Sequence, residues 1–299
     1  MATEQQRQQL VEIKDIEQHK FVKPVKVVTC EDDIRKFLVS EACNNLLKYI
    51  QTISDQIKSK PNDIETPYFK SQPMRYGNKA YRTWYQKMTE NIERVHLEMF
   101  GEESEKYKES IQELSPYLMD AMGNQTRLDY GTGHELHFVV WTFCLRRIGY
   151  LKSEDEIDIA LKVFPCYLEL VRKLQRVYGL EPAGTHGVWS LDDYQFIPFI
   201  WGAAQLINNP FGIKPASITI EKIVDQYYPK YMYLACIKYI NTVKKGPFHE
   251  HSRDLFNISG AASWDKINMG MMKKFYADVL SKVPIIQHFL FGSLVSFSV

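Results

Sequence analysis

Residues 134–148 read HELHFVVWTFCLRRI, and their apolar side chains occupy almost every face of a helix. A helix that is apolar nearly all round must be buried on most of its sides. Its longest apolar stretch, Phe138–Leu145, is far shorter than the roughly 20 residues of a membrane span. Residues 134–148 are therefore predicted to form a central helix surrounded by other helices.

Helical periodicity extends from this run in both directions. Apolar residues recur three and four positions apart, which is typical of helices with one buried face. Such helices are expected over 30–58, 79–99, 111–122, 154–178, 190–207, 217–243 and 264–282. Strand-like alternation is confined to Val25–Val28 and Ser217–Ile220, which are too short to found a sheet. The prediction is an all-α chain, with one irregular multi-helix fold over residues 1–299 rather than a four-helix bundle.

A few residues predict where these helices begin, bend and end. Thr29 and Asp32 resemble an acidic variant of the capping box at the start of the first long helix. Pro165 and Pro198 are expected to kink or interrupt the helices that contain them. Gly179 is a candidate C-cap, the position at which a left-handed backbone ends a helix.

The composition is that of a folded protein with no strong attraction to polyanions. Hydrophobic residues make up 45% and charged residues 24%, which excludes a disordered chain. Because 37 Lys and Arg balance 36 Asp and Glu, neither nucleic acid nor an anionic membrane is an expected partner. The five cysteines form no CxxC pair, so neither a disulfide framework nor a thiolate zinc site is indicated. With its polar N-terminus, the chain is expected to be soluble and intracellular.

The segment RLDYGTGHE, residues 127–135, leads into the central helix and carries two glycines. Glycines before a helix let the backbone approach a ligand closely, and the free N–H groups there favour anions. The guanidinium group of Arg127 is a candidate for donating paired hydrogen bonds to phosphate oxygens. This is neither a Walker A loop, because no Lys-Ser/Thr follows Gly133, nor a GxGxxG motif, because Leu136 stands at the third glycine position. A phosphate site and a plain glycine-rich turn with a helix cap both remain open.

The sequence His134-Glu135-Leu136-His137 does not fit a zinc protease. That site needs two histidines four residues apart on one helical face, whereas these are three apart. A hydrogen bond between His134 and Glu135 across the first helical turn is expected instead. His137 is expected to pack against the neighbouring layer.

A second glycine-bearing segment, EPAGTHGVWSLDD, spans residues 181–193. Its small residues, Trp189 and the two carboxylates Asp192 and Asp193 suit the rim of a groove. The alternative is that both carboxylates lie in the first turn of a helix, where the dipole favours negative charge. A third cluster, residues 245–252, holds His249 and His251 on either side of Glu250, a spacing that suits metal ligands on a strand but not on a helix.

Taken together, these segments resemble one family. They are DYGTGHE (129–135), EPAG (181–184), GVW (187–189) with LDD (191–193), PFIWG (198–202), and QHF (287–289) with FGSL (291–294). In this order, over roughly residues 20–294, the chain resembles the phosphotyrosyl phosphatase activator family and is most similar to its fungal members.

The resemblance implies an all-helical fold with core, linker and lid regions, and a C-terminal tail beyond residue 299. It implies activation of 2A-type serine/threonine phosphatases by contact with the catalytic subunit, aided by ATP and magnesium, and peptidyl-prolyl cis/trans isomerase activity. It also implies a location in the cytoplasm and the nucleus, while a peptide-induced dimer stays open. Carried over by motif, the ATP phosphates would meet Arg127, Thr132, Gly133 and Gly184, Gln287 and His288 would close the site, and magnesium would lie near Gly187.

An isomerase of this kind needs neither a nucleophile nor a metal, because a groove that removes water from a twisted amide lowers the rotation barrier of about 18–20 kcal/mol. Trp189 and Asp193 place an aromatic ring near an acid in the sequence. They are therefore the candidate walls of a groove for a proline-containing peptide. The competing hypothesis is a non-enzymatic chaperone that uses ATP to remodel the phosphatase and load its metal. A helical scaffold without any small-molecule site is a third hypothesis.

Overall fold

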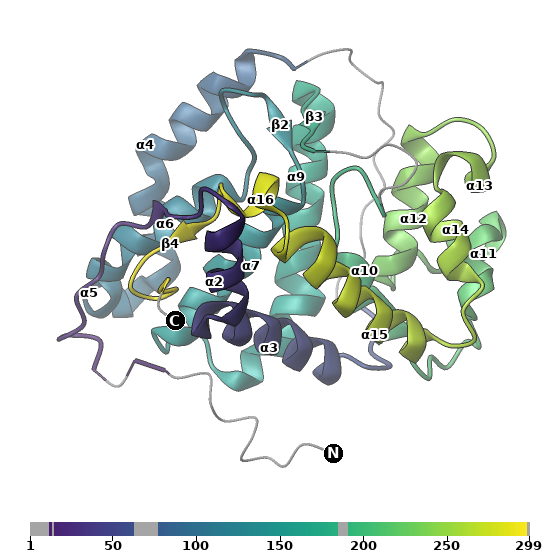
Figure 1. Cartoon of the computed structure of the whole chain (residues 1–299), viewed down its shortest axis with the longest axis horizontal. Coiled ribbons are helices and arrows are strands. Elements are labelled where there is room, and N and C mark those ends of the chain that lie inside the picture. The colour runs from purple at the N-terminus through teal and green to yellow at the C-terminus, as the bar shows by residue number, and fades with distance from the viewer. Residues whose placement is uncertain (1–11, 14, 63–76, 185–190, 298–299) are drawn as a thin grey trace.

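The computed structural model describes residues 12–13, 15–62, 77–184 and 191–297 (Figure 1). The helices are α2 (Glu31–Val39), α3 (Glu41–Gln56), α4 (Ala80–Phe100), α5 (Ser104–Tyr107), α6 (Ile111–Asp120), α7 (Thr132–Arg147), α8 (Glu156–Asp158), α9 (Phe164–Tyr178), α10 (Ile197–Leu206), α11 (Glu221–Tyr227), α12 (Met232–Val243), α13 (Phe248–His251), α14 (Arg253–Ser259), α15 (Trp264–Phe275) and α16 (Val283–Ile286). The strands are β1 (Val25–Lys26), β2 (Asp129–Tyr130), β3 (Glu181–Pro182) and β4 (Leu290–Phe291). The predicted all-α class is confirmed, since these strands form only two-stranded pairs.

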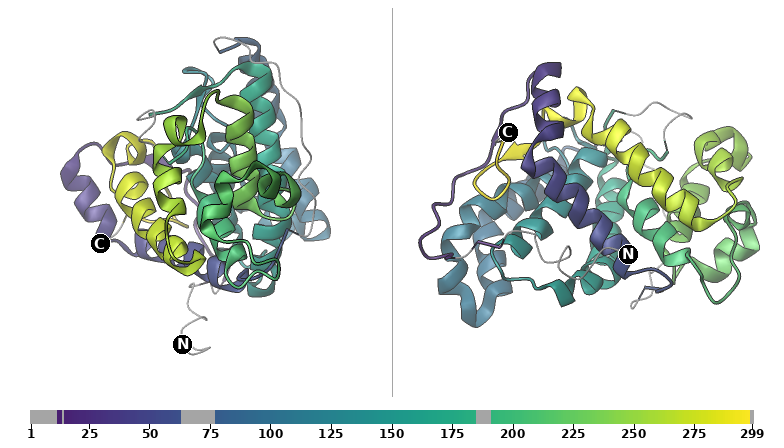
Figure 2. Two further views of the ribbon diagram at one scale, coloured as in Figure 1. Left: turned by 90° about the vertical axis from the view of Figure 1, so that its right-hand side faces the viewer. Right: turned by 60° about the horizontal axis from the view of Figure 1, so that its bottom comes forward.

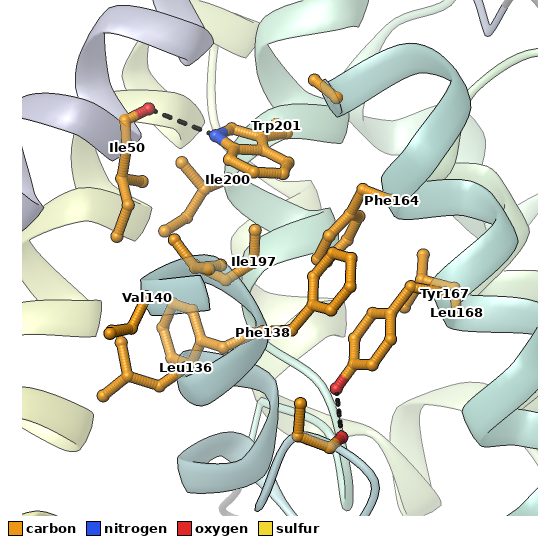
Figure 3. Close-up of a cluster of buried hydrophobic side chains, with 14 of the residues drawn as sticks. Ile50, Leu136, Phe138, Val140, Phe164, Tyr167, Leu168, Ile197, Ile200 and Trp201 are labelled. Carbon is orange, nitrogen blue, oxygen red and sulfur yellow. Dashed lines mark hydrogen bonds between the residues drawn. The ribbon is translucent and has the colours of Figure 1, made fainter. Parts of the chain in front are cut away.

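Helix α7 lies at the centre of the molecule, as predicted from its apolar run (Figure 1). Every residue from His134 to Arg146 is buried. Figure 3 shows Phe138 of α7 against Tyr167 of α9, whose rings stack with centroids 3.8 Å apart. In the same cluster, the indole N–H of Trp201 in α10 donates to the carbonyl of Ile50 in α3 at 3.2 Å. Helix α9 therefore packs on the central helix, and α10 is joined to α3, which also contacts the central helix.

The long helix predicted over residues 30–58 is two helices, α2 and α3, divided at Ser40. Ser40 is extended, with φ −70° and ψ 156°, and its hydroxyl accepts a hydrogen bond from the Cys43 N–H at 3.2 Å. This is an ordinary N-cap, which starts a new helix in a new direction. The expected capping box is also wrong, because Thr29 donates from both its N–H and its hydroxyl to Asp33 at 2.9 Å, while Asp32 pairs with Arg35.

The two prolines have different places in their helices. Pro165 lies inside a continuous helical run, because α8, a π-helical turn over Ile159–Val163 and α9 follow one another without a break. The interruption expected at Pro165 is this π-helical turn, which lies directly before it. Pro198 lies in the first turn of α10, where its missing N–H costs no hydrogen bond. Residues 191–196, which were predicted to be helical, are not helical. The helix predicted over 217–243 is divided into α11 and α12 at Pro229, again for want of an N–H donor.

Other boundaries agree with the sequence. Helices α4 and α6 lie where the periods at 79–99 and 111–122 predict them. Gly179 has the left-handed φ of +59° and ends α9 as its C-cap, with its N–H donating to the Gln175 carbonyl. The segment at 264–282 is α15 followed by a π-helical turn over Tyr276–Leu280.

The two ends of the described chain meet beside α6. Strand β1 pairs antiparallel with β4, so that Val25 lies opposite Phe291. The fully buried carboxylate of Glu113 accepts hydrogen bonds from the Val22 N–H at 3.2 Å and from the Leu294 N–H at 2.6 Å. Helices α4, α5 and α6 lie at this end of the molecule, and α11 to α14 gather at the other (Figures 1 and 2). None of the helices in the described residues is long and apolar enough to cross a membrane.

Candidate functional site

The two glycine-bearing segments lie side by side, although about fifty residues separate them in the sequence. Strand β2 pairs parallel with β3, which places Asp129 opposite Glu181 and Tyr130 opposite Pro182. The Ala183 N–H donates to the Tyr130 carbonyl at 2.8 Å, which extends the pair toward Gly184. A Cβ on Gly131 would lie 2.9 Å from the Ala183 carbonyl oxygen, so the close approach of the two segments requires glycine there.

The paired strands β2 and β3 lie directly beside the N-terminus of α7. Gly131 is the extended N-cap, and Thr132 and Gly133 form the first turn of this sixteen-residue helix. The first N–H groups of a helix have no partner within it and carry the positive end of its dipole. A third segment reaches the same place, because a Cβ on Gly133 would lie 3.3 Å from Cγ2 of Ile285 in α16.

Cationic and imidazole side chains surround this N-terminus. Arg127 donates from Nε to the Asp129 carboxylate at 2.7 Å, and its Nη1 lies 3.4 Å from Nε2 of His288. Asp129 also lies 3.7 Å from Nε2 of His134. An arginine, a carboxylate and an imidazole of residues 127–135 thus meet a second imidazole, His288, from a distant segment.

The pKa values reflect a partly buried, net cationic environment. Burial lowers the pKa of His288, and the positive charges of Arg127 and Lys26 lower it further. Burial acts to raise the pKa of Asp129, but the nearby His134 and Arg127 outweigh it and hold that pKa below its ordinary value. Asp129 is therefore ionised at neutral pH and holds Arg127 in place. One of its oxygens, Oδ1, is buried without a hydrogen-bond partner among the described residues.

The structure brings together the six residues that the sequence assigns to a nucleotide. Arg127 and His288 are in contact, and Thr132 and Gly133 begin the helix beside them. Gly184 is exposed, with φ +70° and no atom within 4 Å of the position of a Cβ. Gln287 is exposed next to His288, and its amide donates to the Pro284 carbonyl at 3.3 Å. Their role toward a ligand stays a prediction.

The residues assigned to a peptide groove and to magnesium are less completely described. Trp189 and Gly187 lie outside the described residues. Asp193 is about a quarter exposed and forms an ion pair with Lys244, which follows α12, at 2.9 Å. Asp192 accepts from the N–H groups of Tyr194 and Gln195, which closes a turn. The helix-start alternative for the two acids is wrong, since α10 begins only at Ile197.

One expectation about the histidines is corrected. His134 does not bond Glu135; its Nδ1 lies 2.6 Å from the Asp120 carbonyl oxygen, on the helix that precedes the segment. His249 and His251 lie on helix α13, on which their spacing does not suit metal ligands, and no group of three metal-ligating side chains occurs among the described residues. The expectation for His137 is confirmed, because its ring stacks on Phe289 with centroids 5.6 Å apart.

Sequence reasoning missed Asp129 as the partner of Arg127. The two residues are separated by Leu128, whose left-handed φ of +56° belongs to a turn that ends where β2 begins. The turn brings the two side chains together, and their spacing in the sequence does not indicate it. The second partner, His288, lies 161 positions from Arg127, and no local pattern indicates it.

Glu135 joins α7 to the start of α10. Its Oε2 accepts hydrogen bonds from the N–H groups of Phe196 at 2.7 Å and Ile197 at 2.8 Å, and the side chain is fully buried. Burial raises the pKa of Glu135 from 4.5 to about 8, although these two donors oppose the shift. The carboxyl group thus fixes the segment that follows the second glycine-bearing stretch.

This pKa predicts how stability depends on pH. Between about 4.5 and 8 the folded state keeps a proton on Glu135 that the unfolded state releases, so the free energy of unfolding falls as pH rises. The Glu135→Gln variant should lose this decline, which we expect to be on the order of 2–4 kcal/mol. Urea denaturation of both proteins at several pH values measures it. An equally steep decline in the glutamine variant would assign it to other groups.

Comparison with known proteins places the chain in a family. The model of the family described as "Phosphotyrosyl phosphate activator (PTPA) protein" matches residues 62–297. The chain belongs to this family, as the segments around the two glycine bends predict.

Individual relatives agree with this assignment. The chain is 72% identical, over 320 aligned positions, to the "Probable serine/threonine-protein phosphatase 2A activator 1" of Dictyostelium discoideum, covering 100% of this chain and 98% of the relative. It is 44% identical to the "Serine/threonine-protein phosphatase 2A activator 2" of Mycosarcoma maydis, covering 87% of this chain and 56% of the relative. It is 42% identical to the "Serine/threonine-protein phosphatase 2A activator" of Drosophila melanogaster, covering 86% and 62% respectively. These identities do not favour the expected fungal affinity.

A solved structure shares the fold. The crystal structure of the PP2A phosphatase activator Ypa1 (PTPA1) superposes with a TM-score of 0.82 at 30% sequence identity. The match covers 93% of this chain and 96% of that one.

Proposed function

We propose that this protein activates a serine/threonine phosphatase of the 2A type by direct contact with the catalytic subunit. The names of the relatives support the proposal, above all that of the Dictyostelium protein, because the match spans 98% of its length. We further propose that ATP and magnesium assist the activation from the surface formed by the two glycine bends.

The observation that carries the nucleotide part is the parallel pairing of β2 with β3. This pairing sets the N-terminus of α7 beside Gly184, with Arg127 and His288 on the same surface. Free helix N–H groups, a glycine at which the backbone is accessible and a forked cation are the groups that proteins use for phosphates. The buried, unpartnered Oδ1 of Asp129 adds an acceptor that a bound cation or a hydroxyl would satisfy.

The side chains present suit magnesium only when a nucleotide is bound together with it. The described residues hold no group of three side chains suited to a metal. Magnesium commonly keeps several waters and binds through one or two carboxylates together with phosphates. Bound ATP with magnesium would supply a polyanion shared between this protein and the phosphatase. Arg127 would hold phosphate oxygens, and Asp129 would orient Arg127.

Peptidyl-prolyl isomerisation is proposed at the surface next to Asp193. The Asp193–Lys244 ion pair joins the segment after the second glycine bend to the end of α12, so a peptide bound there would contact both. Loss of turnover of a prolyl peptide in Trp189→Ala and Asp193→Ala variants would support this assignment, and wild-type turnover would contradict it. The chaperone alternative is favoured if a variant inactive toward the peptide still activates the phosphatase with ATP.

Calorimetry tests the central proposal. ATP with magnesium is titrated into the protein alone, into the phosphatase catalytic subunit alone, and into their mixture, while phosphatase activity is followed in parallel. We expect the tightest binding in the mixture, because part of the phosphate cage would come from the partner. Activation without any nucleotide binding in the mixture would favour the helical scaffold without a small-molecule site.

A further inference from the structure

Three loops enclose a cavity of about 300 Å³ near the junction of α3, α10 and α12. Each loop contributes a proline followed directly by another lining residue: Pro61 with Asn62, Pro210 with Phe211, and Pro229 with Lys230. Tyr231 completes the lining. None of these residues belongs to the surface formed by the glycine bends, so the cavity has no role in the function proposed above.

Hydrogen bonds from a buried glutamine join two of the three loops, and the third loop follows the helix that carries this glutamine. Gln205 of α10 is fully buried, and its Nε2 donates to Oδ1 of Asn62 at 3.0 Å. Its Oε1 accepts from the Met232 N–H at 2.9 Å, at the start of α12. The Asn62 N–H in turn donates to the Lys230 carbonyl at 2.7 Å. The cavity is therefore formed in advance by the fold and does not need a ligand to assemble it.

Aromatic and prolyl rings form the walls of the cavity. Phe211 is 47% exposed, which is unusual for a phenylalanine, and its ring lies 4.9 Å from that of Tyr227 and 6.5 Å from that of Tyr231. The three prolines add flat apolar faces and no N–H donors. Such walls suit another ring, either aromatic or prolyl. At about 300 Å³ the cavity is at the low end for ligand sites and has room for one or two side chains.

Two polar groups at the cavity, on Tyr231 and Lys230, are donors without an acceptor among the described residues, whereas the Asn62 amide is already paired. The Tyr231 hydroxyl is fully buried and has no hydrogen-bond partner among the described residues. The Lys230 ammonium lies 5.5 Å from the centre of the Phe211 ring, at the exposed edge. No carboxylate occurs among the residues that line the cavity. A buried donor without a partner is costly, so the Tyr231 hydroxyl favours an occupant that brings an acceptor oxygen. The exposed Lys230 ammonium favours an occupant with negative charge.

We propose that this cavity binds an acidic peptide segment of a partner protein. The segment places a proline or aromatic ring against the exposed face of Phe211, and a neighbouring aspartate or glutamate accepts hydrogen bonds from Lys230 and the Tyr231 hydroxyl. Ring-lined walls supply most of the contact area, and the two donors select an acidic sequence over a neutral one.

Nuclear magnetic resonance with a short peptide tests the proposal. The probe is N-acetyl-Glu-Phe-Pro-Glu-amide, added to uniformly ¹⁵N-labelled full-length protein. We expect shifts of the amide signals of Asn62, Phe211 and Lys230 that saturate with peptide concentration. The uncharged N-acetyl-Gln-Phe-Pro-Gln-amide should bind about ten-fold more weakly, as expected for loss of hydrogen bonds to charged groups.

Matched variants assign the two donors. Lys230→Ala should weaken binding of the acidic peptide about ten-fold, whereas Lys222→Ala removes an exposed lysine of α11 that does not line the cavity and should have no effect. Tyr231→Phe should weaken binding about three-fold without lowering thermal stability, since its hydroxyl has no partner to lose. Tyr233→Phe removes a comparably buried, unpartnered hydroxyl outside the cavity and should leave binding unchanged.

Several outcomes would overturn the proposal. They are equal affinity for the charged and uncharged peptides, shifts confined to residues away from the three loops, unchanged binding in Lys230→Ala, and no saturable shift at millimolar peptide. Each is read from the chemical shifts of the folded protein. A variant that fails to fold is recognised from its spectrum, and the comparison of the two peptides on the wild-type protein then decides alone.

Discussion

Replacing Gly202 by alanine should destabilise the protein by at least about 3 kcal/mol or prevent it from folding. Gly202 lies in α10 where this helix crosses α12, and a Cβ there would lie 2.3 Å from the backbone nitrogen of Tyr233 and 2.8 Å from its Cα. Backbone atoms cannot rotate away as a flexible side chain can, so the two helices would have to separate. The gain in helix propensity, about 1 kcal/mol, is too small to offset this.

The chain offers a matched control for that substitution. Gly270 lies inside helix α15, and no atom lies within 4 Å of the position that its Cβ would take. Gly270→Ala should therefore stabilise the protein by about 0.5–1 kcal/mol. Urea denaturation followed by circular dichroism measures both variants. A Gly202→Ala protein as stable as the wild type would contradict the close crossing of α10 and α12.

Replacing Gly133 by aspartate should raise the ATP concentration needed for phosphatase activation about a hundred-fold while leaving the fold intact. The new carboxylate would stand in the first turn of α7, where negative charge favours the helix by about 0.3–1 kcal/mol. The same charge would stand where phosphate is proposed to lie, and like charges brought together cost several kcal/mol. We expect nucleotide affinity to fall about a hundred-fold, as measured by titrating ATP in the activation assay.

Gly133→Asn separates charge from size in this experiment. Asparagine has the shape of aspartate without its charge, and both must displace Cγ2 of Ile285, which would lie 3.3 Å from the new Cβ. The asparagine variant should therefore lose much less affinity than the aspartate variant. Intact ATP-dependent activation by Gly133→Asp would argue against a phosphate site at the start of α7.

The parts of the fold that follow from local pattern could be predicted. The burial of α7 follows from an apolar run with no polar face, and the end of α9 follows from one glycine at Gly179. The division between α2 and α3 could not be predicted in this way, because the apolar spacing continues across Ser40 and hides the N-cap. Pro165 and Pro198 mark irregular points in the helical pattern, but the sequence does not show that a π-helical turn accompanies the first and that the second lies at the start of a helix.

The candidate site divides in the same way. The glycine-bearing segments are visible in the sequence, and their likeness to one family links them. Their pairing through β2 and β3 is not visible, because strands of two residues show no alternation that could set a register. The partners of Glu135 lie 61 and 62 positions away, beyond the reach of any helical or strand period.

The Glu113 carboxylate has a consequence for the order of events during synthesis. It bonds the chain near Val22 and again at Leu294, so this contact is complete only when the segment around Leu294 has been made. Proteins emerge from the ribosome N-terminus first, and early parts generally fold before later ones exist. Here the stretch near Val22 gains its second partner only once residue 294 has left the ribosome, so this part of the molecule cannot close before that point.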